Sequence, residues 1–222
     1  MIAHKRTPRL TAELRLEPVQ HTAEARAMLL HVAAEIAEYP PTLTNLQDWS
    51  KELRRIPPLH PRQQAVLEML CTAIDGALKR ESQHRQVWAD YERMLNPGCK
   101  LFLKPFASAH CDAKTNARIH ADTCQFEKGK PCPFGDYYCV NRFGGPCDHI
   151  SAALELASRH WRDVAAAESR KQLHRANARC KRLVRKNLSL WIHRITQALF
   201  QRARTPLYQA EALVVDALIQ PA

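Results

Sequence analysis

The sequence has few glycines, no long apolar run and no secretory signal, and each absence narrows the possible functions. Only six glycines occur in 222 residues, which argues against folds that hold nucleotide phosphates on a Gly-rich loop. No apolar stretch approaches the ~18–20 residues of a membrane span. The basic residues at the start are not followed by the apolar segment of a signal peptide. We therefore expect an intracellular protein with no membrane partner.

Motifs of common hydrolases and deaminases are absent as well. The chain lacks Gly-x-Ser-x-Gly, His-Glu-x-x-His, and the pairing of His-x-Glu with Pro-Cys-x-x-Cys that zinc deaminases need. Acidic residues do not cluster in the way that a two-metal nuclease site requires. From these absences we predict that the protein is not an enzyme.

The net charge of +11 is local. Between residues 159 and 204 there are 13 Lys and Arg against two acids, Asp163 and Glu168, so this segment alone carries +11. The other 176 residues hold 20 basic and 20 acidic side chains, and their net charge is zero. A local excess of cations is typical of a surface that binds a polyanion such as nucleic acid.

The apolar pattern predicts a mainly α-helical fold. Apolar residues recur at three- and four-residue intervals over 18–39, 44–56, 62–95, 151–204 and 207–219. We expect a capping box from Thr44 to Gln47, a single helix of roughly 50 Å over 62–95 and an amphipathic last helix. The predicted fold is a helical bundle with an irregular zinc-binding insertion, divided into regions 1–97, 98–150 and 151–222.

Residues 98–150 differ from the rest of the chain in composition. They contain five of the six glycines and six of the eight cysteines, and the helical periodicity disappears. In a chain without an export signal, such cysteines indicate reduced thiols or metal ligands rather than disulfides. Thiolates on a glycine-rich segment are the ligands that Zn²⁺ selects, and metal binding would supply order that a small core cannot. Cys71 and Cys180 lie at apolar helical positions, where we expect core residues.

The run Cys124-Gln-Phe-Glu-Lys-Gly-Lys-Pro-Cys132-Pro-Phe-Gly-Asp-Tyr-Tyr-Cys139 resembles the first three ligands of a Cys-Cys-Cys-His zinc finger of the muscleblind and tristetraprolin type. The resemblance implies a structural Zn²⁺ and contact with RNA. That family has its fourth ligand, a His, where this sequence has Phe143. Cys147 or His149 could complete the site instead, and Cys111, His110 and His120 are further nearby candidates. An iron–sulfur cluster and a set of unrelated buried cysteines are the alternatives.

The resemblance also implies that aromatic side chains stack on unpaired bases. Phe126, Phe134 and Tyr137 are the candidates, with Tyr138 and Phe143 beside them. Stacking contributes about 1–3 kcal/mol per base. The alternative is that these rings form a small core or dock this region onto the helices.

The most basic segment predicts an amphipathic basic helix over about residues 159–204. At 100° per residue, five cations fall within roughly 80° of one another: Lys171, Arg175, Arg179, Arg182 and Lys186. The apolar residues fall on the opposite side: Leu173, Ala176, Cys180, Leu183, Val184 and Trp191. Aligned cations suit a phosphate backbone, and arginine can bind phosphate with two hydrogen bonds. A solvated charged face, an acidic protein patch and an anionic membrane are the alternatives.

Together these patterns predict a zinc-binding protein that contacts nucleic acid, with RNA or a single strand slightly favoured over duplex DNA. The alternative is a zinc-stabilised subunit of a larger nucleoprotein assembly, such as a mobile-element or CRISPR-type effector, whose helices mainly bind protein partners.

Overall fold

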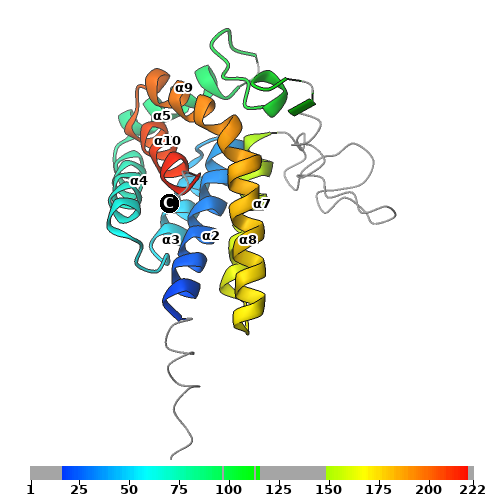
Figure 1. Cartoon of the computed structure of the whole chain (residues 1–222). Helices are drawn as coiled ribbons and strands as arrows, with labels where there is room; N and C mark the ends of the chain where they lie inside the picture. The colour runs from blue at the N-terminus through cyan, green and yellow to red at the C-terminus, as the bar shows by residue number, and fades with distance from the viewer. Residues whose placement is uncertain (1–16, 97, 113, 116–148, 220–222) are drawn as a thin grey trace, which may run out of the picture.

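The computed structural model describes residues 17–96, 98–112, 114–115 and 149–219, and this part of the chain is mainly α-helical, as predicted (Figure 1). It contains eight α-helices and no β-strand; Phe106 and His149 form one isolated antiparallel bridge. The helices are α2 (Glu17–Glu38), α3 (Leu43–Leu53), α4 (Pro61–Lys79), α5 (Glu81–Met94), α7 (Ile150–Ala165), α8 (Arg170–Lys186), α9 (Ile192–Arg202) and α10 (Pro206–Ile219), with short 3-10 turns at Ala107–Ala109 and Leu188–Leu190. None of these described helices is long and apolar enough to cross a bilayer.

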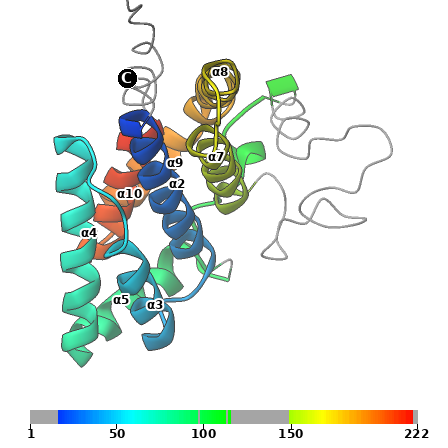
Figure 2. The same ribbon diagram turned by 90° about the horizontal axis from the view of Figure 1, so that it is seen from below.

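Helix α2 lies between two groups of helices (Figure 2). On one side it packs antiparallel to α7, its most extensive contact, and α8 packs on α7. Small residues, Ala23 and Ala27 on α2 and Ala153 and Ala157 on α7, are fully buried and let the two backbones approach closely. The Ser158 hydroxyl donates to the Ala27 carbonyl at 2.7 Å across this contact.

Helix α10 lies on the other side of α2, against α4, α9 and α5. The prediction of an amphipathic last helix is wrong, because nine of its 14 residues are buried: Leu207, Tyr208, Ala210, Glu211, Ala212, Val214, Val215, Leu218 and Ile219. A helix that is covered by neighbours on most sides buries residues around most of its circumference, rather than along a single face. One hydrophobic core therefore joins helices from both ends of the chain.

The side chain of Asp90 anchors the start of α10. Its Oδ2 accepts hydrogen bonds of 2.8 Å from the backbone N–H groups of Arg204 and Thr205 and from the Thr205 hydroxyl. Its Oδ1 accepts from the guanidinium of Arg93. Asp90 on α5 is 2% exposed, so it satisfies buried donors that would otherwise lack a partner.

Glu211 on α10 is fully buried, and burial raises the pKa of its carboxyl to about 8. Because the folded-state pKa lies above that of the unfolded chain, the contribution of this group to stability is full below about pH 4.5 and is lost as the pH rises toward 8. Within that window the free energy of unfolding falls by about 1.4 kcal/mol per pH unit.

We expect Glu211→Gln to flatten this decline in the free energy of urea unfolding between pH 5 and 8. A matched Glu24→Gln variant, at an exposed site on α2, should keep the wild-type slope; equal slopes in all three proteins would contradict the prediction.

The single long helix expected over 62–95 is wrong. The chain leaves helical geometry at Arg80 (φ −132°, ψ 114°), which separates α4 from α5. Just before this break, Gly76 lies against Gln83 of α5; a Cβ there would meet Gln83 Oε1 at 2.7 Å. The turn at Arg80 lets both α4 and α5 pack on the core. A single straight helix over these residues would extend past the core.

Two further boundaries differ from expectation. The cap of α3 is Thr42, whose hydroxyl accepts from the Asn45 N–H at 3.1 Å, rather than Thr44. The basic segment 159–204 is not one helix, because the chain turns after Ala165 and again at Asn187. The basic helix itself is α8.

Candidate nucleic-acid interface

Helix α8 has the amphipathic character that its sequence predicts. Its start is capped by Ser169, whose hydroxyl accepts from the Gln172 N–H, while the Gln172 side chain accepts from the Glu168 N–H. The side that faces the protein buries Ala176, Cys180, Leu183 and Val184. Leu173 is partly buried on the same core, and Trp191 is buried just beyond the helix.

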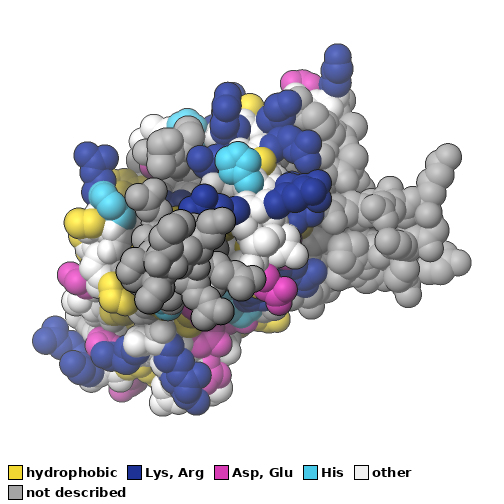
Figure 3. Space-filling model, turned by 60° about the horizontal axis from the view of Figure 1, so that its bottom comes forward, with side chains coloured by type: hydrophobic (Ala, Val, Ile, Leu, Met, Phe, Trp, Pro, Cys, Tyr) yellow, Lys and Arg dark blue, Asp and Glu magenta, His cyan; other side chains and the backbone are white. Residues whose placement is uncertain are grey.

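The opposite side of α8 is cationic and exposed. The sequence-predicted residues Lys171, Arg175, Arg179, Arg182 and Lys186 are all exposed, and α8 contains eight Lys and Arg with no acid. Asp163 on α7 lies 3.5 Å from the Arg179 guanidinium. Within the described part of the chain, no acidic side chain forms an ion pair with Lys171, Arg175 or Arg182. In Figure 3, Lys and Arg gather over the α7 and α8 side of the molecule, whereas cations and acids mix on the opposite side.

A shallow hollow of about 490 Å³ lies on this face, lined by Arg175, Ala178, Arg179 and Arg182. The short side chain of Ala178 leaves room between three guanidinium groups. Such a group can present paired N–H donors to a phosphate. The hollow therefore has the size and the donors to accept a phosphate group.

The charges of this face also act on a neighbouring histidine, His160 of α7. Burial lowers the pKa of His160 on α7, and the charges of Arg179 and Arg182 lower it further, against the opposing effect of Asp163. His160 is therefore held neutral at pH 7, beside cations that repel a second positive charge.

The inner side of α8 packs on α7, and the charge of Arg26 on α2 acts on it. The guanidinium of Arg26 lies 4.8 Å from the ring centre of Trp161, and Cys180 is buried beneath α8. Burial raises the pKa of the Cys180 thiol to about 12, against the charge of Arg26. Cys180 is thus a neutral core residue, as predicted, and Cys71 on α4 packs partly buried against the same core. The buried inner side therefore seats α8 on the core with its cations on the exposed side.

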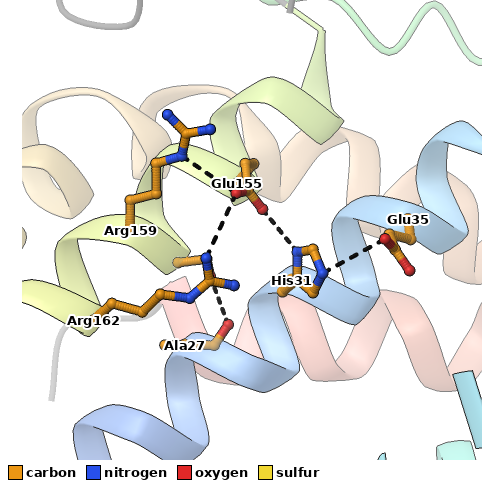
Figure 4. A network of polar contacts seen from close by, with 7 residues as sticks. Ala27, His31, Glu35, Glu155, Arg159 and Arg162 are labelled. Carbon is orange, nitrogen blue, oxygen red and sulfur yellow. Dashed lines mark hydrogen bonds and ion pairs between the residues drawn. The ribbon is translucent and has the colours of Figure 1, made fainter. Parts of the chain in front are cut away.

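Several cations of the basic segment outside α8 have partners within the protein. Figure 4 shows Arg159 and Arg162 of α7 turned toward the buried carboxylate of Glu155, at 3.3 Å and 4.0 Å. Arg194 of α9 donates to the carbonyl of His110 at 2.8 Å. These three arginines are engaged by groups of the protein itself, whereas most of the exposed cations of the segment lie on α8.

Most of the predicted zinc ligands and stacking residues lie outside the described residues: Cys124, Cys132, Cys139, Cys147, His120, Phe126, Phe134, Tyr137, Tyr138 and Phe143. His149 is described, and it caps α7. Its Nδ1 lies 2.7 Å from the Ser151 hydroxyl and 3.1 Å from Glu38 Oε2. Cys111 is partly buried, and Nε2 of His110 lies 3.0 Å from the Lys104 carbonyl.

Sequence reasoning missed the buried polar network around Glu155. His31 and Glu35, four residues apart on α2, carried a weak signal, because such a pair shares one helix face. Nothing in the pattern connected them with Glu155, 124 residues after His31.

Comparison with known proteins adds no functional information, since no family model, curated protein or solved structure matches the chain.

Proposed function

We propose that the protein binds nucleic acid through the exposed cationic face of α8. The observation that supports this best is the row of exposed Lys and Arg on a helix without acids, fixed on the core by its other side. A charged face that is merely solvated normally carries acids that relieve repulsion among its cations. Phosphates would relieve that repulsion here and would release counterions on binding.

RNA or a single strand is favoured over duplex DNA. This preference is supported by the sequence resemblance to RNA-binding fingers and by the aromatics Phe126, Phe134 and Tyr137, which could stack on unpaired bases. In this proposal the protein acts inside the cell as a binding protein, without a catalytic step.

The salt dependence of RNA binding tests the proposal. A fluorescently labelled single-stranded RNA should bind at low salt, and the logarithm of its association constant should fall linearly with the logarithm of salt concentration. Contact with four phosphates by the cations of α8 predicts a slope of about −3, at about 0.7 per phosphate on a single strand. A protein that ignores RNA and DNA even at low salt would rule out this function.

We also propose that one structural Zn²⁺ orders the Cys-rich region, held by Cys124, Cys132 and Cys139 with Cys147 or His149 as the fourth ligand. The surroundings of His149 suit such a role. A metal-bound histidine commonly holds its other ring nitrogen against a carboxylate, and Glu38 lies at Nδ1 of His149. A site closed by four protein ligands leaves no position open for catalysis.

Metal analysis checks the zinc proposal. We expect one zinc per chain that is bound through thiolates, and its loss in the Cys132→Ser/Cys139→Ser variant. The matched variant Cys71→Ser should keep the metal, because Cys71 lies in the helical core. A well-folded protein without this zinc would overturn the proposal, and a brown protein would indicate an iron–sulfur cluster instead.

The second candidate is a subunit of a nucleoprotein assembly. The observation that favours it is an apolar groove of about 1070 Å³ between α4, α5 and α10, beside which Met69 and Phe200 are about half exposed. An exposed apolar groove of this size can accept a helix from a protein subunit. If the isolated protein fails to bind nucleic acid in the salt experiment, this candidate is the one to pursue.

A further inference from the structure

A cluster of three possible metal ligands lies where α2 meets α3, away from the cationic face of α8. It consists of His31 and Glu35, one turn apart on α2, and Glu52 near the end of α3. One ligand atom of each residue lies within 4.8 Å of those of the other two, and all three residues are partly buried. Glu35 and Glu52 also line a hollow of about 290 Å³.

A buried carboxylate fixes the orientation of the histidine in this cluster. The Nδ1 of His31 lies 2.9 Å from Oε2 of Glu155, which is 1% exposed (Figure 4). A carboxylate accepts hydrogen bonds, so the ring N–H must be on Nδ1. In a neutral imidazole this leaves the lone pair on Nε2, directed at Glu35. Metal-binding histidines are commonly held in this way.

The separation between Nε2 of His31 and Oε1 of Glu35 is 3.5 Å. Two acceptor atoms that face each other repel unless a proton or a metal cation lies between them. Zinc bonds of about 2.0–2.2 Å at tetrahedral angles place two ligand atoms about 3.4 Å apart. The observed separation therefore fits two ligands of one shared metal ion.

We propose that His31, Glu35 and Glu52 bind a divalent first-row transition ion, with Glu155 as the residue that positions His31. One imidazole and two carboxylates form a nitrogen and oxygen site, which suits Mn²⁺ and Zn²⁺. Three protein ligands leave at least one coordination position, which the hollow opens to water. The site is independent of the Cys-rich region and of the proposed nucleic-acid interface.

The charges around the cluster are compatible with a bound cation. Lys51 and Arg55 line the same hollow and are exposed, so solvent screens their repulsion. Arg159 and Arg162 lie on the far side of Glu155 and offset the charge of that buried carboxylate. The two glutamates of the cluster repel each other, and a divalent ion neutralises both.

Titration of the full-length protein with Mn²⁺ alone, with electron paramagnetic resonance of the free ion as the readout, tests the site. Mn²⁺ is chosen because cysteine thiolates do not favour it, so this result is separable from that of the zinc experiment. We expect one Mn²⁺ per chain and at least a tenfold weaker association in Glu52→Gln. The matched Asp48→Asn variant, on the same helix and in the same hollow, should bind as the wild type does.

A second readout locates the ion. Bound Mn²⁺ is paramagnetic and its broadening falls steeply with distance, so the ring proton signals of the ligand His31 should be broadened at lower Mn²⁺ concentrations than those of His84, whose Nε2 lies 2.8 Å from the Pro41 carbonyl. Absence of Mn²⁺ binding, or equal binding by Glu52→Gln and wild type, would overturn the proposal.

Discussion

Reversal of two charges on α8, in the variant Arg175→Glu/Arg179→Glu, is expected to reduce RNA affinity by more than 100-fold at moderate salt. Both arginines line the hollow on the exposed face, so the substitution would replace two of the proposed phosphate contacts with two repulsive charges. For a single strand, each phosphate contact that is lost also makes the plot of log association constant against log salt concentration less steep, by about 0.7. Fluorescence anisotropy over a series of salt concentrations gives both quantities.

A control of equal net charge separates local contact from general attraction. Arg62 and Lys79 are exposed on α4, so Arg62→Glu/Lys79→Glu changes the charge of the protein by the same amount at a different site. We expect this variant to lose only a few-fold in affinity and to keep the wild-type salt slope. If both double variants bind equally weakly, α8 is not the interface and only the overall charge matters.

Loss of the Asp90 carboxylate is expected to have the largest effect on stability. In Asp90→Ala, the N–H groups of Arg204 and Thr205 and the Thr205 hydroxyl lose their acceptor, and Arg93 loses its ion pair. Removal of one partner from a buried charged network costs about 3–5 kcal/mol. The cost is large here because these donors begin α10, which packs on four other helices. Urea unfolding followed by circular dichroism measures the change.

Two further variants test this explanation. Thr205→Val removes one of the four donors to Asp90 and should cost about 1 kcal/mol. Asp48→Ala, at an exposed position on α3, should change the free energy of unfolding by less than about 0.5 kcal/mol. An Asp90→Ala variant as stable as Asp48→Ala would contradict the role assigned to the carboxylate.

The amino-acid sequence by itself determined the helical class, most helix positions and the two faces of α8. These features depend on residues three or four positions apart, which share a helix face whatever the rest of the chain does. The exposed cations from Lys171 to Lys186 could therefore be identified without a structure, and so could the core role of Cys180.

The tertiary structure decided the features that depend on which distant segments meet. The neighbours of α10 bury most of its surface, and the packing of α4 and α5 on one core accompanies the break at Arg80. The contact between α2 and α7 brings Glu155 to His31, and with α3 it creates the proposed metal site. No local pattern specifies these contacts, because they depend on how separate helices pack against one another, in the case of α2 and α7 more than 100 residues apart in the sequence. For the same reason, only the structure showed that Arg159 and Arg162 pair with Glu155 and that Arg194 donates to the His110 carbonyl.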